Sequence, residues 1–320
     1  MILAPAFLLK ILAIIPALGL FMLADYFFFD MRISNSLPRA AEKTGWLNML
    51  FMFPHVIASF FTFMNREYIV AYATRLGLSS TAILGGIVLI PVFSTNDLII
   101  LILLVYTAYH QVSQQTGIAA LIAQSKATTH QLWKWGYLTI MLALVFSAAL
   151  KKSGVISVLS AYPYNHAFKA ALGLLFIGYA WVCFSTARQS RTRMGTFYIA
   201  GSTALIAVNC VLFYFEYYLY MLFLGRFIHD ATAFSFYVSH NVNRNKSKPQ
   251  SLSSRIRESL RIPEYILTPA AALLTAVLLT TLVPDRYLLV ILLFLAFFHY
   301  YWEGVMWKKG SPHRKYIALS

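Results

Sequence analysis

The chain has 320 residues, of which 59% are hydrophobic and 12% are charged. A water-soluble domain carries about 25% charged residues, so this composition excludes a protein with one aqueous-facing globular fold and indicates a chain solvated by the lipid bilayer. The formal net charge of +15 does not indicate nucleic-acid binding, because no basic run is interleaved with base-stacking aromatic residues outside a hydrophobic stretch.

Apolar stretches recur along the whole sequence, and most have the roughly 20 residues that an α-helix needs to cross the hydrocarbon core. The sequence therefore predicts an all-α, polytopic integral membrane helical bundle, a single transmembrane domain over residues 1–320 with about ten transmembrane helices. In chain order the predicted spans are Ala4–Ala24, Leu47–Met64, Gly77–Ser94, Asp97–Ala123, Leu132–Leu150, Ala167–Ala187, Thr196–Phe215, Tyr217–His240, Tyr265–Val283 and Tyr287–Trp307.

Lysine and arginine are spread unevenly over the predicted loops. If the N-terminus is cytoplasmic, most of them fall on the cytoplasmic side, as the positive-inside rule requires. This distribution predicts an inner (cytoplasmic) membrane protein with both termini in the cytoplasm. Residues 241–264 form the one long basic loop of this scheme. We interpret it as a segment that stops transfer through the membrane, with attraction to anionic lipid headgroups as the alternative.

Four predicted spans each contain one histidine: His55, His110, His229 and His299. A charged group within the bilayer costs about 2.5–3.5 kcal/mol, so ionisable residues there are functional candidates. The last three lie 12 or 13 residues after the outer end of a span that runs inward. At a rise of about 1.5 Å per residue their imidazoles are expected at one level, which His55 also reaches if its span begins a few residues early.

Further polar residues accompany these histidines. Glu303 follows His299, and Gln114 follows His110, by four positions, so that each pair shares one helix face. The pattern predicts one or two metal ions bound by the four histidines and Glu303, because helical bundles build metal sites from side chains of separate helices. Gln114 and Asp230 are predicted to orient ligands.

Imidazole with carboxylate suits iron, zinc or copper and suits magnesium or calcium weakly. Non-haem iron is the predicted metal, with zinc or haem as alternatives. Purely structural roles are the alternative for these residues. Each histidine by itself could bridge two helices. Glu303 could pair with Arg226 or Lys308, and Asp230 could pair with Arg226.

Aromatic residues surround the histidine and glutamate of the last span, in the run FFHYYWEGVMWKKG. They could pack helices together or line a channel for a long apolar molecule. Phe236, His240 and Tyr300 are the predicted substrate-binding residues, with His240 at the boundary of its span. The expected partners are membrane lipid and a lipophilic small-molecule substrate.

These features predict a membrane-embedded iron oxidoreductase that oxidises or oxidatively cleaves a lipophilic substrate. The alternatives are a proton- or metal-coupled transporter that uses the buried His, Asp and Glu residues, and a haem-binding membrane protein. Motifs for nucleotide binding, serine hydrolysis and HExxH metalloproteases are absent from the sequence.

The motifs Pro54-His55, Tyr109-His110-x-x-x-Gln114-x-x-Gly117, His229-Asp230 and His299-Tyr300…Glu303…Trp307-Lys308 resemble those of polytopic bacterial membrane proteins that have one buried histidine per helix. Among characterised families, the chain is most similar in this respect to the Brp/Blh-type β-carotene 15,15′-dioxygenases. The resemblance implies iron held by histidines of several transmembrane helices, and cleavage of an apolar polyene with dioxygen.

Overall fold

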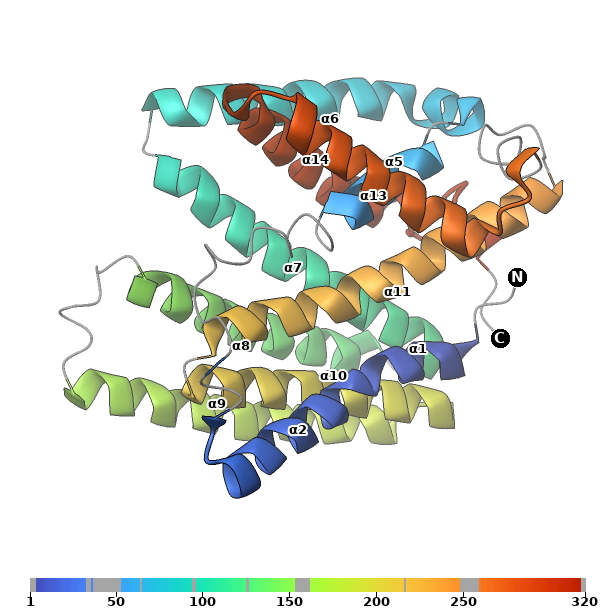
Figure 1. Cartoon of the computed structure of the whole chain (residues 1–320). Helices are drawn as coiled ribbons and strands as arrows, with labels where there is room; N and C mark the ends of the chain where they lie inside the picture. The colour runs from blue at the N-terminus through green and yellow to red at the C-terminus, as the bar shows by residue number, and fades with distance from the viewer. Residues whose placement is uncertain are drawn as a thin grey trace. The chain divides into compact units, whose positions relative to one another are not determined.

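The computed structural model of the chain is helical, with no strand in the residues it describes (Figure 1), and this confirms the all-α prediction. The structure describes residues 4–32, 36, 53–63, 65–93, 96–124, 127–152, 162–215, 217–247 and 259–317.

Within the described residues, six helical stretches are long and apolar enough to cross a membrane, so the chain fits a membrane protein. They are Ala6–Phe29, Arg66–Leu89, His166–Arg188, Arg193–Tyr214, Glu264–Leu282 and Tyr287–Met306. Each overlaps one of the ten predicted spans. The predicted total of about ten is not confirmed.

The four remaining predicted spans are helical but are not among these six. They correspond to α5 (Phe53–Phe63), α7 (Asn96–Ala123), α8 (Ala127–Lys152) and α11 (Tyr218–Ser247). The 11 residues of α5 extend about 16 Å, which is about half of the hydrocarbon core. Residues 47–52 of that predicted span lie outside the described residues.

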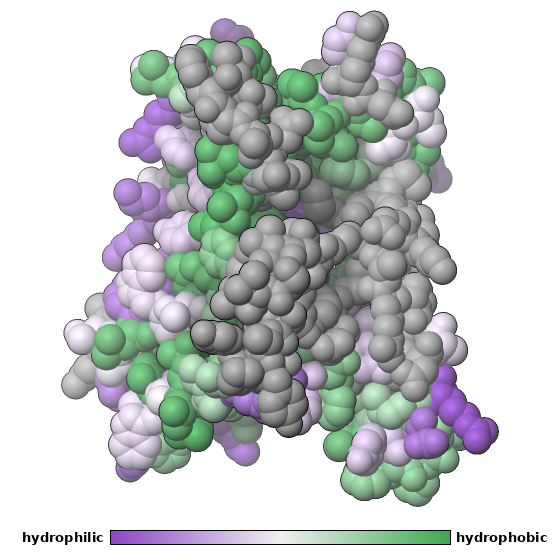
Figure 2. Space-filling view, turned by 90° about the vertical axis from the view of Figure 1, so that its left-hand side faces the viewer, coloured by the Kyte–Doolittle hydropathy of each residue, from purple (hydrophilic) through white to green (hydrophobic). Residues whose placement is uncertain are grey.

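Large apolar side chains are exposed on the candidate spans, as lipid-facing residues would be. Phe28 is 81% exposed, Leu282 73% and Trp181 71%. Figure 2 shows hydrophobic residues in green at several places on the face that it displays. Contiguous apolar exposure of this kind is unusual on a soluble monomer and is expected where lipid is the solvent.

The helices form two compact units. The first unit comprises residues 1–4, 45–107 and 230–320, and the second comprises residues 5–44 and 108–229. Helices α7 and α11 each contribute residues to both units, because the divisions at 107/108 and 229/230 fall within these continuous helices.

In the first unit, the short helix α5 packs against α13 (Glu264–Leu282) and α14 (Asp285–Met306), and α14 also packs against α6 (Arg66–Phe93). The core of this unit is rich in aromatic side chains. Tyr68, Tyr237 and Trp302 are each 0% exposed, and Ala272 and Ala276 of α13 lie among them. Small residues on α13 permit the close approach of α5, as is usual for helices packed within membranes.

In the second unit, α9 (Tyr162–Arg188) packs against α8 and α10 (Arg193–Tyr214), and α1 (Pro5–Leu12) and α2 (Ile14–Phe29) pack against α10. The turn into α10 is tied to the end of α7. Thr192 accepts a hydrogen bond from the Gly195 amide at 3.0 Å as the N-cap, and its hydroxyl donates to the Ile122 carbonyl at 2.6 Å. The cap thus joins two helices and satisfies an otherwise free N–H at the helix start.

The predicted basic loop at residues 241–264 begins later than expected, because α11 continues to Ser247. Contacts within the first unit explain the extra two turns. Asn241 donates to a Glu264 carboxylate oxygen at 3.0 Å, Asn243 donates to the Tyr316 carbonyl at 2.8 Å, and Arg244 lies 3.8 Å from Glu67. Residues 248–258 lie outside the described part of the chain.

The approach of α10 to α7 yields the first prediction, which concerns Gly195. A Cβ atom at this position would lie 2.2 Å from the Ala123 Cα and 2.6 Å from its Cβ. Because backbone cannot move as a flexible side chain can, Gly195→Ala should lower the free energy of unfolding by about 1–3 kcal/mol. Thermal unfolding in detergent measures this loss.

Gly178→Ala in α9 is the matched control, since a Cβ there meets nothing within 4 Å. It should leave stability unchanged or raise it by up to about 1 kcal/mol through helix propensity. Equal stability of the two variants would contradict the close contact at Gly195.

Candidate metal centre

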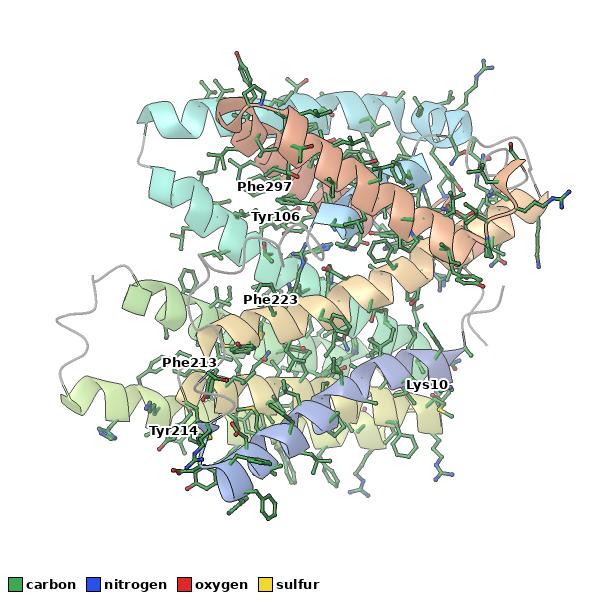
Figure 3. The ribbon with its side chains drawn as sticks, viewed as in Figure 1. Lys10, Tyr106, Phe213, Tyr214, Phe223 and Phe297 are labelled. Carbon is green, nitrogen blue, oxygen red and sulfur yellow. The ribbon has the colours of Figure 1, made fainter. Side chains whose placement is uncertain are left out.

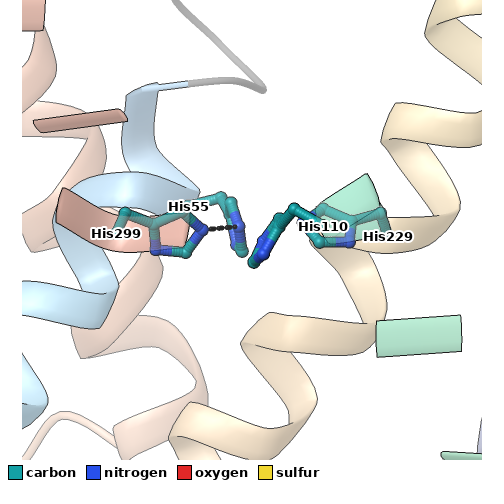
Figure 4. A group of neighbouring side chains, drawn as sticks. All are labelled: His55, His110, His229 and His299. Carbon is teal, nitrogen blue, oxygen red and sulfur yellow. Dashed lines mark hydrogen bonds between the residues drawn. The ribbon is translucent and has the colours of Figure 1, made fainter. Parts of the chain in front are cut away.

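Four buried histidines form a group that could hold a metal ion (Figure 4). One ligand nitrogen of each of His55, His110, His229 and His299 lies within 4.8 Å of the others. Their exposed fractions are 0%, 5%, 3% and 0%. They come from four different helices, α5, α7, α11 and α14, and they are the four histidines that the sequence selected.

His55 and His299 are in direct contact within the first unit. Their Nε2 atoms are 2.8 Å apart and their rings meet edge to face, with centroids 4.5 Å apart. Figure 4 marks this contact by a dashed line. Two nitrogens at this distance share one proton, because two lone pairs or two N–H groups would repel each other.

The hydroxyl of Ser59 fixes the tautomer of His299. Ser59 donates its single hydrogen to the Val56 carbonyl at 2.6 Å, and its oxygen lies 2.9 Å from the His299 Nδ1. The oxygen can therefore only accept, so His299 carries its proton on Nδ1 and presents the Nε2 lone pair to His55. A second hydrogen bond of this type is what orients most metal-binding histidines.

His110 and His229 form a corresponding pair in the second unit. Their ring centroids are 4.8 Å apart, and the rings meet at 73°. Gln114, one turn after His110, donates from its side-chain amide to the backbone carbonyl of His229 at 3.2 Å. Gln114 thus links the two helices that bear these histidines, which is a way to orient them without touching a ring.

The two carboxylate residues singled out from the sequence, Glu303 and Asp230, make different contacts. Glu303 is 3% exposed but does not belong to the four-histidine group. Its carboxylate instead accepts a short hydrogen bond from the Tyr237 hydroxyl, and Tyr237 stacks on the His55 ring at 5.8 Å. Asp230 lies 3.8 Å from the His55 Nε2, a distance that suits electrostatic attraction and exceeds a hydrogen bond.

The predicted substrate-binding residues do not gather around the histidines. Phe236 packs against Trp307, with ring centroids 6.1 Å apart. Tyr300 meets the His299 ring at 5.5 Å and exchanges a 2.9 Å hydrogen bond with Thr107. His240 belongs to a separate polar network, whereas Tyr300 is in contact with His299.

The separate network joins His240 to the C-terminal segment. The Tyr68 hydroxyl lies 2.8 Å from the His240 Nε2, and the Asn241 oxygen lies 3.1 Å from its Nδ1. His313 is 0% exposed, stacks on Tyr68 at 3.6 Å and lies 5.2 Å from the His240 ring. Residues after α14 are therefore docked into the first unit and are not a free tail.

Three residues of these sites could not be singled out from the sequence. Ser59 carries a weak signal, because it follows His55 by one turn of a helix, the spacing at which a hydroxyl shares a face with a histidine. Tyr237 is one of many tyrosines in the chain. His313 lies among basic residues after the last span, a context that indicates a solvated tail.

Comparison with known protein families, with curated proteins and with solved structures finds no match to this chain.

The Ser59 hydroxyl yields the second prediction. Ser59→Ala leaves the His299 ring free to rotate and to exchange its tautomer, so metal affinity should fall by about 10- to 100-fold. Titration of the metal-free protein with Fe²⁺ or Zn²⁺ measures the change.

Thr62→Val is the matched control on the same helix, because the Thr62 hydroxyl is buried but donates to the Ser59 carbonyl and not to a ring. An equal loss of affinity in both variants would show that Ser59 acts only through the stability of α5.

The docked His313 yields the third prediction. Burial, together with the neighbouring His240 and Arg244, lowers the pKa of His313 to about 2. Since the unfolded chain gains a proton near pH 6.5 and the folded chain does not, stability should fall as the pH drops below about 6.5, by at most about 1.4 kcal/mol per pH unit from this residue.

His313→Phe preserves a ring against Tyr68 and removes this proton uptake. The stability difference between pH 7 and pH 5 should therefore be smaller in His313→Phe than in the wild type. His166→Phe, at an exposed position of α9, should leave the difference unchanged. Parallel pH curves for the wild type and His313→Phe would mean that His313 is protonated in the folded protein.

Proposed function

We propose that the chain is a membrane-embedded non-haem iron oxidoreductase that oxidises or oxidatively cleaves a lipophilic substrate. The observation that carries the proposal is the convergence of four buried imidazoles from four helices. The membrane-suited helices provide the apolar surroundings from which such a substrate would be taken.

A bound metal is the best explanation for the histidine group. The four ligand nitrogens lie within 4.8 Å of one another, and side chains that converge from separate helices are how helical bundles build metal sites. His55 and His299 are in direct contact through their Nε2 atoms. To hold a metal through both Nε2 atoms, His55 would have to carry its proton on Nδ1, as metal binding to histidine generally requires.

The donor set favours a transition metal. Neutral imidazole suits iron, zinc and copper and suits magnesium or calcium poorly. Iron is the member of this set that supplies dioxygen chemistry when a coordination position stays open. The motif resemblance to Brp/Blh-type dioxygenases supports the same metal and an apolar polyene or hydrocarbon chain as the class of substrate.

The acidic residues Asp230 and Glu303 lie next to the four histidines or their contacts, and we assign a role to each. The Asp230 carboxylate near His55 stabilises positive charge at that imidazole. Glu303 bonds to Tyr237, which stacks on His55. This pair is positioned to hold a proton beside the histidines without binding the metal.

A transporter is the second candidate, and the distribution of polar residues along α11 favours it. Arg226, His229, Asp230, His240 and Arg244 are all at most 7% exposed, and they extend over 18 positions, or about 27 Å of helix. Polar groups placed through the depth of a bundle are typical of an ion or proton pathway.

Metal analysis of the purified protein tests the proposal and is the fourth prediction. The wild type should contain about one equivalent of iron or more per chain, without a haem absorption band. Single His110→Ala, His229→Ala and His299→Ala variants should each lose most of it. His130→Ala is the control, because His130 is buried in α8 against Trp133 and outside the group.

Metal retained in all three single variants would overturn the metal centre. Protein without metal that drives proton-coupled uptake into vesicles would replace the enzyme by the transporter. A haem band would replace non-haem iron by haem.

A further inference from the structure

An apolar groove of about 490 Å³ lies in the first unit among α6, α7 and α14. Its floor and walls are formed mainly by small and branched residues, which are Ala82, Ile83, Gly86, Ile87, Ile99 and Ile102. The volume falls within the roughly 300–1,000 Å³ of small-molecule sites, which are typically apolar with a few polar groups that fix orientation.

The two ends of the groove differ in chemistry. Helices α6 and α14 run antiparallel, because Trp302 donates to the Ser79 hydroxyl at 3.1 Å while Leu293 packs with Ile87. Arg75, Ser79 and Tyr301 therefore line one end, and Ile87 and Ile99 line the other. Along α6, Arg75 and Ile87 are about 18 Å apart.

On one side, the groove is lined by aromatic rings that lead toward His299. Tyr106 and Phe297, which lie side by side in Figure 3, stack with centroids 6.1 Å apart. Tyr106 also meets Tyr300 edge to face at 5.6 Å, and Tyr300 meets the His299 ring at 5.5 Å. One layer of tyrosine thus separates the middle of the groove from a predicted metal-binding histidine.

We propose that this groove binds a long-chain carboxylate, with its head at Arg75 and its hydrocarbon chain running toward Ile87 and Ile99. Arg75 is the single charged residue among those that line the groove, and it is exposed. A guanidinium binds a carboxylate through two parallel hydrogen bonds. The apolar remainder of the groove suits a hydrocarbon chain.

This inference rests on the proposed function and narrows its substrate class. With the head held at Arg75, the middle of the chain lies against Tyr106 and Phe297, beside the tyrosine that contacts His299. The carboxylate end then stays remote from the histidines, so reaction would be expected within the chain and not at the head.

Photolabelling of the full chain in detergent micelles tests the groove and is the fifth prediction. The probe is a palmitate-length fatty acid with a diazirine at mid-chain, and its methyl ester is the uncharged comparison. Labels should map to peptides that contain Tyr106 or Phe297. Gly86→Phe, which fills the groove, should abolish labelling at these peptides.

Two matched controls separate the groove from general lipid contact. Gly85→Phe changes the adjacent residue of α6, which does not line the groove and whose Cβ would meet nothing within 4 Å, so labelling should persist. Arg75→Gln should weaken binding of the acid by about tenfold or more and leave the ester unchanged. Arg66→Gln, at another exposed arginine of α6, should affect neither probe.

The outcomes distinguish this inference from the proposed function. Labelling of the groove in a His299→Ala variant that has lost its metal would support the groove by itself. Labels spread over the lipid-facing helices, or equal labelling in Gly85→Phe and Gly86→Phe, would overturn it even if the protein contains iron. Equal binding of acid and ester to the wild type would overturn the role of Arg75.

Discussion

The candidate site depends on one physical constraint: imidazole nitrogens removed from water must find partners. Four histidines are at most 5% exposed, and their ligand atoms lie within 4.8 Å of one another. A charged imidazolium in an apolar bundle is disfavoured. Neutral rings that share a proton, as the Nε2 atoms of His55 and His299 do, or that would hold a metal ion meet this constraint.

Helix α5 has a large part in meeting this requirement. It supplies His55 and Ser59 from the same face. Its close packing on α13, where Ala272 and Ala276 are buried, holds both residues against α14. The fold thus uses α5 as a support for the His299 ring.

Helix α11 connects two polar regions of different character. His229 belongs to the group that could hold a metal ion, whereas His240, about 16 Å further along the helix, joins the network around His313. The second region docks the C-terminal segment and keeps its imidazole neutral. The groove beside α14 is a third feature, because its aromatic wall reaches His299 from the other side of Tyr300. Together these features give the proposed enzyme separate elements for metal binding, anchoring and substrate entry.

The sequence by itself determined the helical class, the fit to a membrane and the four histidines, because apolar run length and the cost of burying imidazole can be read without coordinates. It did not determine the places of Glu303 and His240, the helical start of the basic loop, or the length of α5. These depend on side-chain pairing between helices distant in sequence. Only the tertiary structure decided that Tyr237 binds Glu303 and that Ser59 orients His299, since many tyrosines and serines have equivalent local sequences and only packing selects one.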